Sequence, residues 1–209
     1  MCEKKGQILF TVKSPYMVAD VKDVSYDGEK KELPRVTALC RCGESKNMPY
    51  CDGSHAKVNF SGEKERASGK GSVKAYTGND ITIYFNAKIC AHVGRCLKLE
   101  GVFSNLKKPW INPDGDSVEN IISTIEKCPS GALSYQIQGE ELVKAFGQSE
   151  KIKIKKGGPL CVEGGLSLVD TLDSEKELES REHYTLCRCG KSKNKPFCDG
   201  MHHEVGFDK

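Results

Sequence analysis

The alternation of apolar and polar positions predicts several short strands rather than one large helical core. Three stretches alternate with the two-residue period of a strand: DITIYF at 80–85, ALSYQI at 132–137 and KIKIK at 151–155. In the last of these, Ile152 and Ile154 are expected to face inward and the lysines to face water. The pattern therefore indicates a chain rich in β-structure.

One segment has the period of a helix instead. In DSVENIISTIEKC, residues 116–128, apolar side chains recur on one face at Val118, Ile121, Ile122 and Ile125. Asp116, with Glu119 three residues later, is typical of a capping box at a helix start. Pro129 follows directly and is expected to end the helix, because a proline disfavours helical backbone angles at the residue before it.

A sixteen-residue pattern occurs twice, as CRCGESKNMPYCDGSH at 40–55 and CRCGKSKNKPFCDGMH at 187–202. The upstream stretches 14–24 and 158–170 also resemble each other, since both place a proline before a short apolar run and then alternate like strands. Aligning their prolines puts Met17 opposite Cys161, which makes Cys161 a packing residue rather than a ligand. The sequence thus contains an internal repeat.

A different module separates the two copies. Residues 61–72 are polar and glycine-bearing, as in a linker. We therefore predict three domains, over residues 1–66, 67–149 and 150–209. The expected fold class is α+β, with two small β-rich modules and an α+β module between them.

Composition agrees with small modules. The chain has 209 residues, of which 37% are hydrophobic and 29% charged, which is lean for one large core. The 32 basic and 29 acidic residues nearly balance, whereas basic residues usually dominate in nucleic-acid-binding proteins. No apolar run reaches the roughly 18 residues of a membrane helix, and the start lacks a secretory pattern. The expected location is the cytoplasm, with neither nucleic acid nor a membrane as partner.

Eleven cysteines, an odd number set in repeated motifs beside histidines, indicate metal ligation rather than disulfides. In an extended segment, Cys40 and Cys42 point to one side and can bind one metal atom. Cys51 and His55 are one helical turn apart and can bind a second. Asp52 can accept hydrogen bonds from the amides that begin this turn.

The second copy supplies a matching set at identical spacing: Cys187, Cys189, Cys198 and His202. Thiolate and imidazole ligands suit zinc as well as a 2Fe–2S cluster, so ligand type alone leaves both open. Zinc fingers, however, favour two to four residues between paired cysteines, and here only one separates them. The spacing therefore favours a 2Fe–2S cluster in each copy.

The pattern C-x-C-x₂-S-x₃-P-x-C-D-G-S-H resembles the CDGSH iron–sulfur proteins, the mitoNEET-like family. The first copy matches every position, and the second departs only at Met201, where serine is usual. The resemblance implies one 2Fe–2S cluster per motif, held by three cysteines and one histidine. Single-motif members form homodimers under a shared β-cap, so two copies in one chain imply a monomer with an intramolecular pseudo-dimer, whose cap comes from 14–24 and 158–170.

The middle module resembles the divergent single-cluster ferredoxin domain over roughly residues 71–138. The matching pieces are CAHVGRC at 90–96, KKPWINPDG at 107–115 and CPSGALSY at 128–135. The implied ligands are Cys90, Cys96 and Cys128. Bacterial ferredoxins would place another cysteine at position 93, which is valine here. The cluster is then 3Fe–4S, or 4Fe–4S with an unusual ligand for which His92 is the nearest candidate.

These features favour a soluble, non-enzymatic electron carrier. The chain shows no Ser–His–Asp set and neither a dinucleotide-binding nor a phosphate-binding loop. The expected partner is a redox protein, either a flavoprotein or of the ferredoxin type. Lysines flank the two motifs and suit an acidic partner: Lys46, Lys191, Lys193 and Lys195. The alternative is cluster storage, cluster transfer or redox sensing, because a histidine ligand leaves iron when it is protonated.

Overall fold

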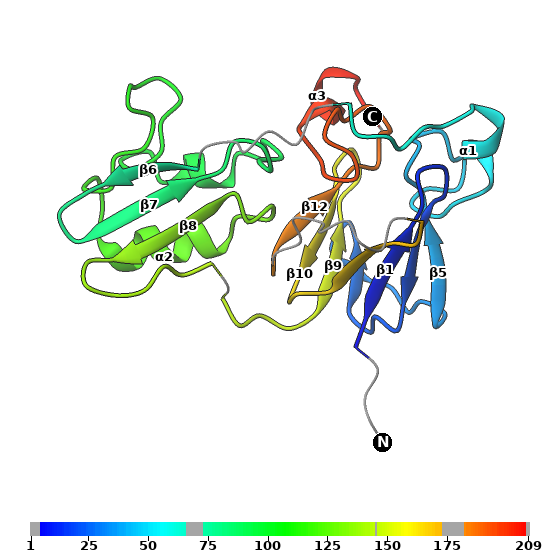
Figure 1. The fold of residues 1–209 in the computed structure, drawn as a ribbon, viewed down its shortest axis with the longest axis horizontal. Helices are drawn as coiled ribbons and strands as arrows, with labels where there is room; N and C mark the ends of the chain where they lie inside the picture. The colour runs from blue at the N-terminus through cyan, green and yellow to red at the C-terminus, as the bar shows by residue number, and fades with distance from the viewer. Residues whose placement is uncertain (1–4, 66–72, 145, 173–181, 208–209) are drawn as a thin grey trace.

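The structure, a computed structural model, describes residues 5–65, 73–144, 146–172 and 182–207. It is a mixed α/β structure, mostly short strands with few helices (Figure 1). The strands form three sheets. Much of the predicted linker, and the predicted boundary between residues 66 and 67, lie outside the described residues.

The repeated halves build two of these sheets. The first has the strand order β11–β1–β2–β5, with bounds β11 Ser167–Asp170, β1 Gln7–Phe10, β2 Tyr16–Ala19 and β5 Val36–Leu39. The second has the order β12–β10–β9–β3–β4, with bounds β12 Tyr184–Leu186, β10 Leu160–Glu163, β9 Lys151–Ile154, β3 Val24–Tyr26 and β4 Glu29–Lys30. The predicted strand at 151–155 is confirmed as β9.

Each half contributes to the sheet of the other: the second half gives β11, and the first half gives β3 with its hairpin partner β4. Strand β11 comes from the second half and runs parallel to β1, with Gln7 opposite Ser167. Strand β3 comes from the first half and runs parallel to β9, with Val24 opposite Ile152. The two sheets are therefore completed reciprocally.

The upstream stretch 14–24 holds β2 and the first residue of β3, and the stretch 158–170 holds β10 and β11. In each stretch a change of backbone direction separates the two strands. At these changes Asp20 has φ 56° and Gly164 has φ 83°, both in the left-handed region that ends an extended strand. A Cβ on Gly164 would lie 2.4 Å from the backbone of Ser149 and Glu150, so glycine is required for this close approach. The change of direction leads the following strand to the other sheet.

The two sheets bury a single apolar core. It draws from both halves, with members Ile8, Phe10, Tyr16, Val18, Val24, Leu39, Ile152, Ile154, Leu160, Val162, Leu166, Leu168, Tyr184, Leu186 and Phe197. Burial of such side chains is the main favourable contribution to folding. Because one core serves both halves, a change in either half affects the stability of both.

The middle module has its own sheet and core. Strands β6 Lys74–Thr77, β7 Ile81–Phe85 and β8 Leu133–Ile137 pair antiparallel, and helix α2, Val118–Glu126, packs against β8. A short 3₁₀ turn, η1, spans Arg95–Lys98. The strands predicted at 80–85 and 132–137 are confirmed as β7 and β8.

The predicted helix over 116–128 is confirmed as α2, but the expected cap is wrong by one residue. Ser117 is the N-cap, with extended backbone angles, and its hydroxyl accepts from the amide of Asn120 (3.3 Å). Asp116 instead accepts from the amide of Ser117 and the side chain of Asn120. The serine hydroxyl thus satisfies an amide of the first helical turn, one residue beyond the one that a cap at Asp116 would reach.

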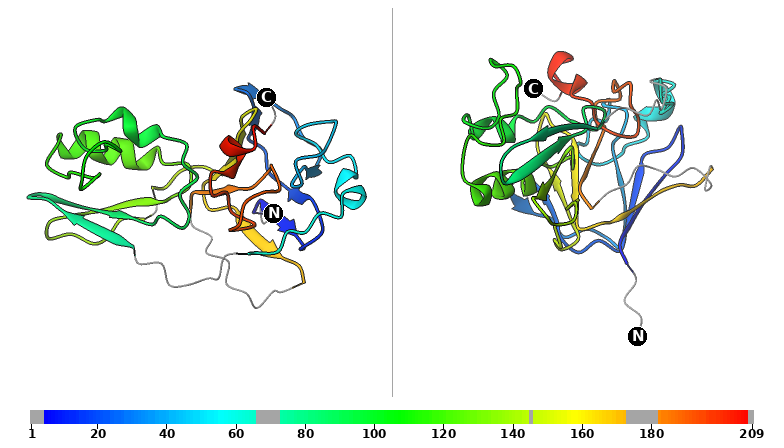
Figure 2. Two further views of the ribbon diagram at one scale, coloured as in Figure 1. Left: turned by 90° about the horizontal axis from the view of Figure 1, so that it is seen from above. Right: turned by 60° about the vertical axis from the view of Figure 1, so that its left-hand side comes forward.

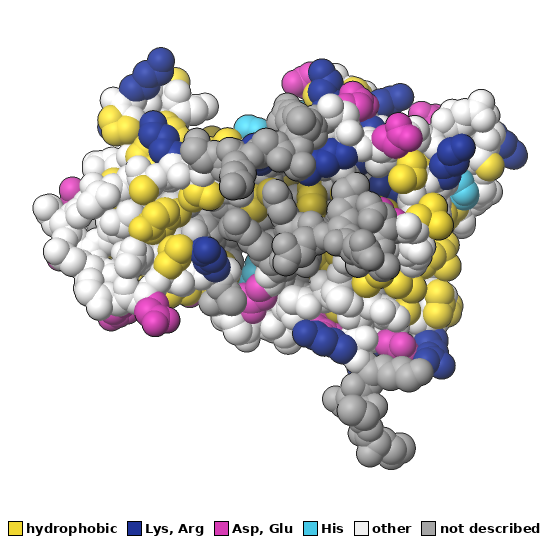
Figure 3. All heavy atoms as spheres, in the orientation of Figure 1, with side chains coloured by type: hydrophobic (Ala, Val, Ile, Leu, Met, Phe, Trp, Pro, Cys, Tyr) yellow, Lys and Arg dark blue, Asp and Glu magenta, His cyan; other side chains and the backbone are white. Residues whose placement is uncertain are grey.

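Two single helical turns lie at one end of the paired sheets: α1, Ser54–Lys57, and α3, Met201–Glu204. In Figures 1 and 2, α3 lies between the middle module and α1. None of the helices in the described ranges could cross a membrane. Basic and acidic side chains are mixed over the face drawn in Figure 3, in keeping with the nearly balanced charge.

Candidate metal centres

The first motif places two thiols side by side at the end of β5. The Sγ atoms of Cys40 and Cys42 are 3.8 Å apart, and both side chains are buried. Two sulfurs bound to one tetrahedral metal atom with bonds of about 2.3 Å lie about 3.8 Å apart. Their mutual hydrogen bond lowers the pKa of the Cys40 thiol and raises that of Cys42, so one thiolate forms readily and a metal must displace the remaining proton. This pair fits a shared metal atom.

A second pair lies at the start of α1. Cys51 Sγ is 3.3 Å from His55 Nδ1, close to the separation expected for a sulfur and a nitrogen on one metal atom. Helix α1 begins only at Ser54, so Cys51 stands before the helix and reaches His55 across a tight turn. Asp52 holds this turn by accepting from the amides of Ser54 (3.0 Å) and Lys46 (2.8 Å), which lower its pKa. The predicted contact of Asp52 with the helix start is therefore present.

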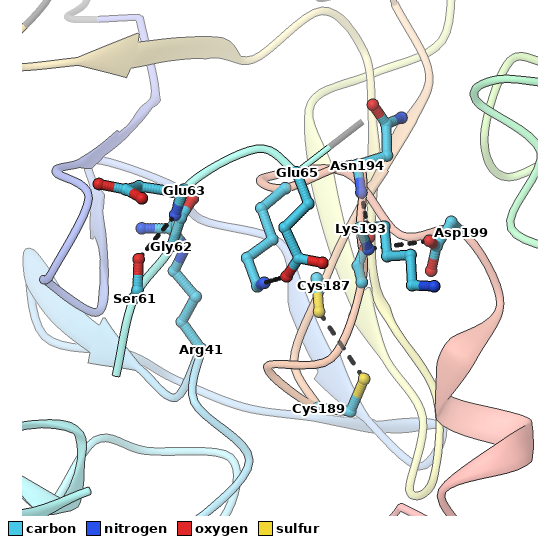
Figure 4. Close-up of polar contacts among 12 residues, drawn as sticks. Arg41, Ser61, Gly62, Glu63, Glu65, Cys187, Cys189, Lys193, Asn194 and Asp199 are labelled. Atoms are coloured by element: carbon cyan, nitrogen blue, oxygen red, sulfur yellow. Dashed lines mark hydrogen bonds and ion pairs between the residues drawn. The ribbon is translucent and has the colours of Figure 1, made fainter. Parts of the chain in front are cut away.

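The second motif repeats this geometry. Cys187 and Cys189 have their Sγ atoms 3.7 Å apart, and Cys198 Sγ lies 3.3 Å from His202 Nδ1. Asp199 accepts from the amides of Lys193 and Met201, as Asp52 does in the first copy. Figure 4 shows the thiol pair and the Lys193–Asp199 contact. The departure from serine at position 201 leaves the arrangement of donors intact.

The two copies differ in exposure. Cys51 and His55 are partly exposed, whereas only 2% of the surface of Cys198 and 4% of that of His202 is exposed to solvent. Burial, with smaller contributions from His203 and His92, lowers the pKa of His202 to about 4. The ring therefore stays in its neutral, metal-binding form down to a lower pH than an ordinary histidine does.

The two C-x-C segments pack back to back. A Cβ on Gly43 would lie 2.7 Å from the carbonyl oxygen of Cys189, and one on Gly190 would lie 2.4 Å from that of Cys42. Met48 packs against the cysteine pairs of both copies. Any side chain at either glycine would push the two ligand segments apart.

Each C-x-C segment also carries a buried arginine that the sequence reasoning did not single out. Arg41 donates to the carbonyls of Thr11 (2.5 Å) and Gly62 (3.3 Å), and its guanidinium lies 4.7 Å from the ring centroid of Phe10. Arg188 donates to the carbonyls of Lys155 and Gly158. The signal was available, because both copies place arginine between the paired cysteines and arginine is rarely buried without a specific role.

The middle module gathers its three cysteines around one pocket. Cys90, Cys96 and Cys128 line it together with His92 and Arg95. Cys96 lies in η1, and Cys128 follows α2. Burial and the neighbouring thiolates raise the pKa of Cys96 to about 11, and burial raises that of Cys90. A bound metal would have to displace these protons, so site formation and metal binding are coupled.

Within the described ranges, no three histidine, cysteine or acidic side chains converge on one metal-ion position. In the two motifs the donors come as pairs instead, one thiol pair and one thiol–imidazole pair in each. In the middle module Val93 is 38% exposed, and nothing at that position can donate to a metal. The module therefore supplies three cysteine ligands, and a 4Fe–4S cluster would need a fourth ligand of another kind.

The flanking lysines are not equivalent. Lys46, Lys191 and Lys193 are exposed, as a docking role requires. Lys195 is buried, and its ammonium lies 3.4 Å from a carboxylate oxygen of Glu65. Lys195 thus stabilises the fold rather than a partner contact, because a buried lysine needs a local counter-charge.

Comparison with known proteins agrees with this geometry. The family model described as "Iron-binding zinc finger CDGSH type" matches residues 13–56 and 157–203, and the model described as "Divergent 4Fe-4S mono-cluster" matches residues 76–138. "Uncharacterized protein YjdI" of Escherichia coli, strains K12 and O157:H7, is 48% identical over 67 residues, which is 32% of this chain and 88% of the relative. No solved structure matches the chain.

The matches cover both copies of the thiol–imidazole motif and the three-cysteine module between them. They coincide with the segments in which the donors meet in space. The chain therefore belongs to the CDGSH iron-binding proteins, as a tandem member whose two CDGSH domains flank a divergent 4Fe–4S mono-cluster domain.

Proposed function

We propose that the chain is a non-enzymatic one-electron carrier with two 2Fe–2S clusters and one 3Fe–4S or 4Fe–4S cluster. The proposed ligands are Cys40, Cys42, Cys51 and His55 for the first, Cys187, Cys189, Cys198 and His202 for the second, and Cys90, Cys96 and Cys128 for the third. A bound iron–sulfur cluster accepts and returns single electrons.

The observation that carries this proposal is the pairing of donors. Each motif offers a thiol pair at 3.8 or 3.7 Å and a thiol–imidazole pair at 3.3 Å. Two separate pairs of donors suit a cluster with two metal atoms, whereas a single zinc ion needs four donors around one point. The ligand set therefore favours iron–sulfur chemistry.

The surrounding residues orient the ligands. The amides of Gly53 and Gly200 donate to Cys51 Sγ and Cys198 Sγ, at 3.4 and 3.5 Å, and the amide of Glu44 donates to Cys42 Sγ. Hydrogen bonds to ligand sulfurs are among the features that set a cluster's potential. They also fix each sulfur in place before a metal binds.

The exchange of β3 and β11 and the reciprocal approach of Gly43 and Gly190 support an intramolecular pseudo-dimer of residues 1–66 and 150–209. We propose a flavoprotein or a ferredoxin-type protein as the redox partner. The exposed Lys46, Lys191 and Lys193 favour a partner with an acidic docking surface.

The proposal predicts a coloured protein with acid-labile sulfide. Oxygen-free purification followed by iron and sulfide quantitation should give about two iron atoms per CDGSH motif, and more for the middle module. EPR of the oxidised and reduced protein then tells a three-iron from a four-iron centre. A colourless preparation with stoichiometric zinc and no labile sulfide would contradict the proposal.

A second candidate function, cluster storage or transfer, is favoured by one observation. Cys51 and His55 are partly exposed, so an acceptor can approach this pair, whereas Cys198 and His202 are buried. The first motif would then be the donor site, because ligand exchange needs access to the metal.

The His55→Cys variant tests this second function. A thiolate is anionic and binds iron more tightly than a neutral imidazole, so the variant should retain its first cluster at a lower pH and pass it more slowly to an apo-ferredoxin. The matched variant His202→Cys should change transfer much less, since that site is covered. Bleaching below pH 6 and colour transfer are the measurements. Equal acid loss in wild type and His55→Cys would rule out histidine-controlled release.

A further inference from the structure

The three ligand sets are connected in a fixed order, beginning with a contact between the middle module and the second CDGSH motif. His92 has a left-handed backbone, φ 52°, and follows Cys90 by two residues. Its side-chain atoms Cβ, Cγ and Cδ2 lie 3.1–3.4 Å from the place that a Cβ on Gly200 would occupy. Gly200 in turn donates its amide to Cys198 Sγ. His92 thus connects the segment that carries Cys90 with the turn of the second motif at Gly200.

A second contact holds this junction in place. The side-chain amide of Asn194 donates to the carbonyl of Lys88 (2.8 Å), which ties the loop of the second motif to the segment just before Cys90. A further close approach follows Cys128, where a Cβ on Gly131 would lie 2.5 Å from the carbonyl of His183. The two modules are therefore in close contact both just before Cys90 and just after Cys128.

The second motif is joined to the first through the C-x-C segments. The backbone of Gly190 packs on Cys42, and that of Gly43 packs on Cys189. In Figures 1 and 2, α3 lies between the middle module and α1, which is the same order. The sequence order of the modules, first motif, middle module, second motif, thus differs from their spatial order.

Exposure follows the spatial order. At one end, Cys90, Cys96 and Cys128 are partly exposed; at the other end, so are Cys51 and His55. The four ligands between them, Cys187, Cys189, Cys198 and His202, are all buried. A partner can therefore come directly to ligand side chains at either end, whereas the ligands of the central motif are covered.

We infer that the three centres form a linear electron-transfer chain. The second CDGSH motif is its central member, and the His92–Gly200 contact joins that motif to the middle module. This inference rests on the proposed function. One electron from an external one-electron donor enters at an exposed end, passes to the second CDGSH motif and leaves at the other end to an external one-electron acceptor, so that the donor is oxidised and the acceptor reduced by one electron each. No bond is made or broken and no proton is transferred. Tunnelling falls off steeply with distance, so packed contacts favour this route.

EPR of cluster-deleted variants tests the order. In a redox state where neighbouring centres are both paramagnetic, the middle-module signal should be broadened by the second motif. Cys198→Ser, which removes the central cluster, should abolish that broadening, and Cys51→Ser, which removes the first cluster, should leave it unchanged. Broadening that depends on Cys51 instead, or on neither residue, overturns this order of the centres. Absence of clusters from the wild-type chain would instead refute the proposed function.

A glycine pair tests the junction without deleting a cluster. Gly200 and Gly53 hold equivalent places with φ 92° and 86°, so alanine strains both turns alike. A Cβ at Gly200 meets the ring of His92, whereas one at Gly53 meets nothing within 4 Å. With the rates normalised to the iron content measured for each variant, freeze-quench EPR after substoichiometric dithionite should show severalfold slower electron redistribution between the middle and central centres in Gly200→Ala alone. Equal rates in the two variants would overturn the junction.

His92→Ala separates a junction from a ligand. The variant should retain the iron of the middle module while the redistribution slows as in Gly200→Ala. Loss of that iron would make His92 a ligand of the cluster and would overturn its assignment as a contact between modules. Iron quantitation and the EPR lineshape of the middle centre are the two readouts.

Discussion

Cys198→Ser is expected to lose about two iron atoms per chain and to unfold at a much lower temperature than the wild type. Only 2% of the surface of Cys198 is exposed to solvent, and its neighbour Phe197 belongs to the core that both sheets share. Metal binding in small domains supplies folding free energy, on the order of 10 kcal/mol for structural zinc sites. The loss of one ligand therefore weakens both halves.

Cys161→Ser is the matched control. It makes the same atomic change on β10, at a residue that packs between Thr185 and Lys153 and belongs to neither motif. It should keep full iron content and shift the unfolding temperature by only a few degrees, as typical single substitutions do. Iron quantitation and thermal unfolding followed by circular dichroism measure both effects. Equal iron content in Cys198→Ser and Cys161→Ser would exclude Cys198 as a ligand.

Arg41→Met is expected to lower the free energy of unfolding by about 3 kcal/mol, because it removes the donors to two carbonyls. Those carbonyls belong to Thr11 and Gly62, and the guanidinium also lies over the rings of Phe10 and Tyr16. The same change removes the buried positive charge of the residue that separates Cys40 from Cys42 in the sequence. An added electron is then less stabilised, so the reduction potential of the first cluster should fall.

Two further variants separate these effects. Arg41→Lys keeps the charge but lacks the planar fork of donors, so stability should fall while most of the potential is retained. Arg35→Met removes an arginine whose side chain is 67% exposed and paired with Asp20, and should change neither quantity appreciably. Denaturant unfolding and spectroelectrochemical titration are the measurements. An unchanged potential in Arg41→Met would show that its charge does not act on the cluster.

Local pattern predicted the local elements well. The alternation at 80–85, 132–137 and 151–155 appears as β7, β8 and β9, and the helical period at 116–128 appears as α2. The spacing of the two motifs likewise predicted which donors would meet in pairs. These results depend on contacts within a few residues, which periodicity and ligand spacing encode directly.

Contacts between distant segments could not be predicted in this way. The alternation in 14–24 does not reveal that Asp20 breaks the strand or that Val24 pairs with Ile152 in the other sheet. A two-residue period fixes which face of a strand is buried but not which strand lies beside it. For the same reason the packing of His92 on Gly200 became visible only in three dimensions.

The exchanged strands have a consequence for biosynthesis. During translation, β3 leaves the ribosome early, but its parallel neighbour β9 is made only after the whole middle module. Strand β1 must wait still longer for β11. The middle module, whose strands and helix are contiguous in the chain, is free to fold first. The flanking halves then mature together, so a nascent chain that stalls before Lys151 cannot complete either outer sheet.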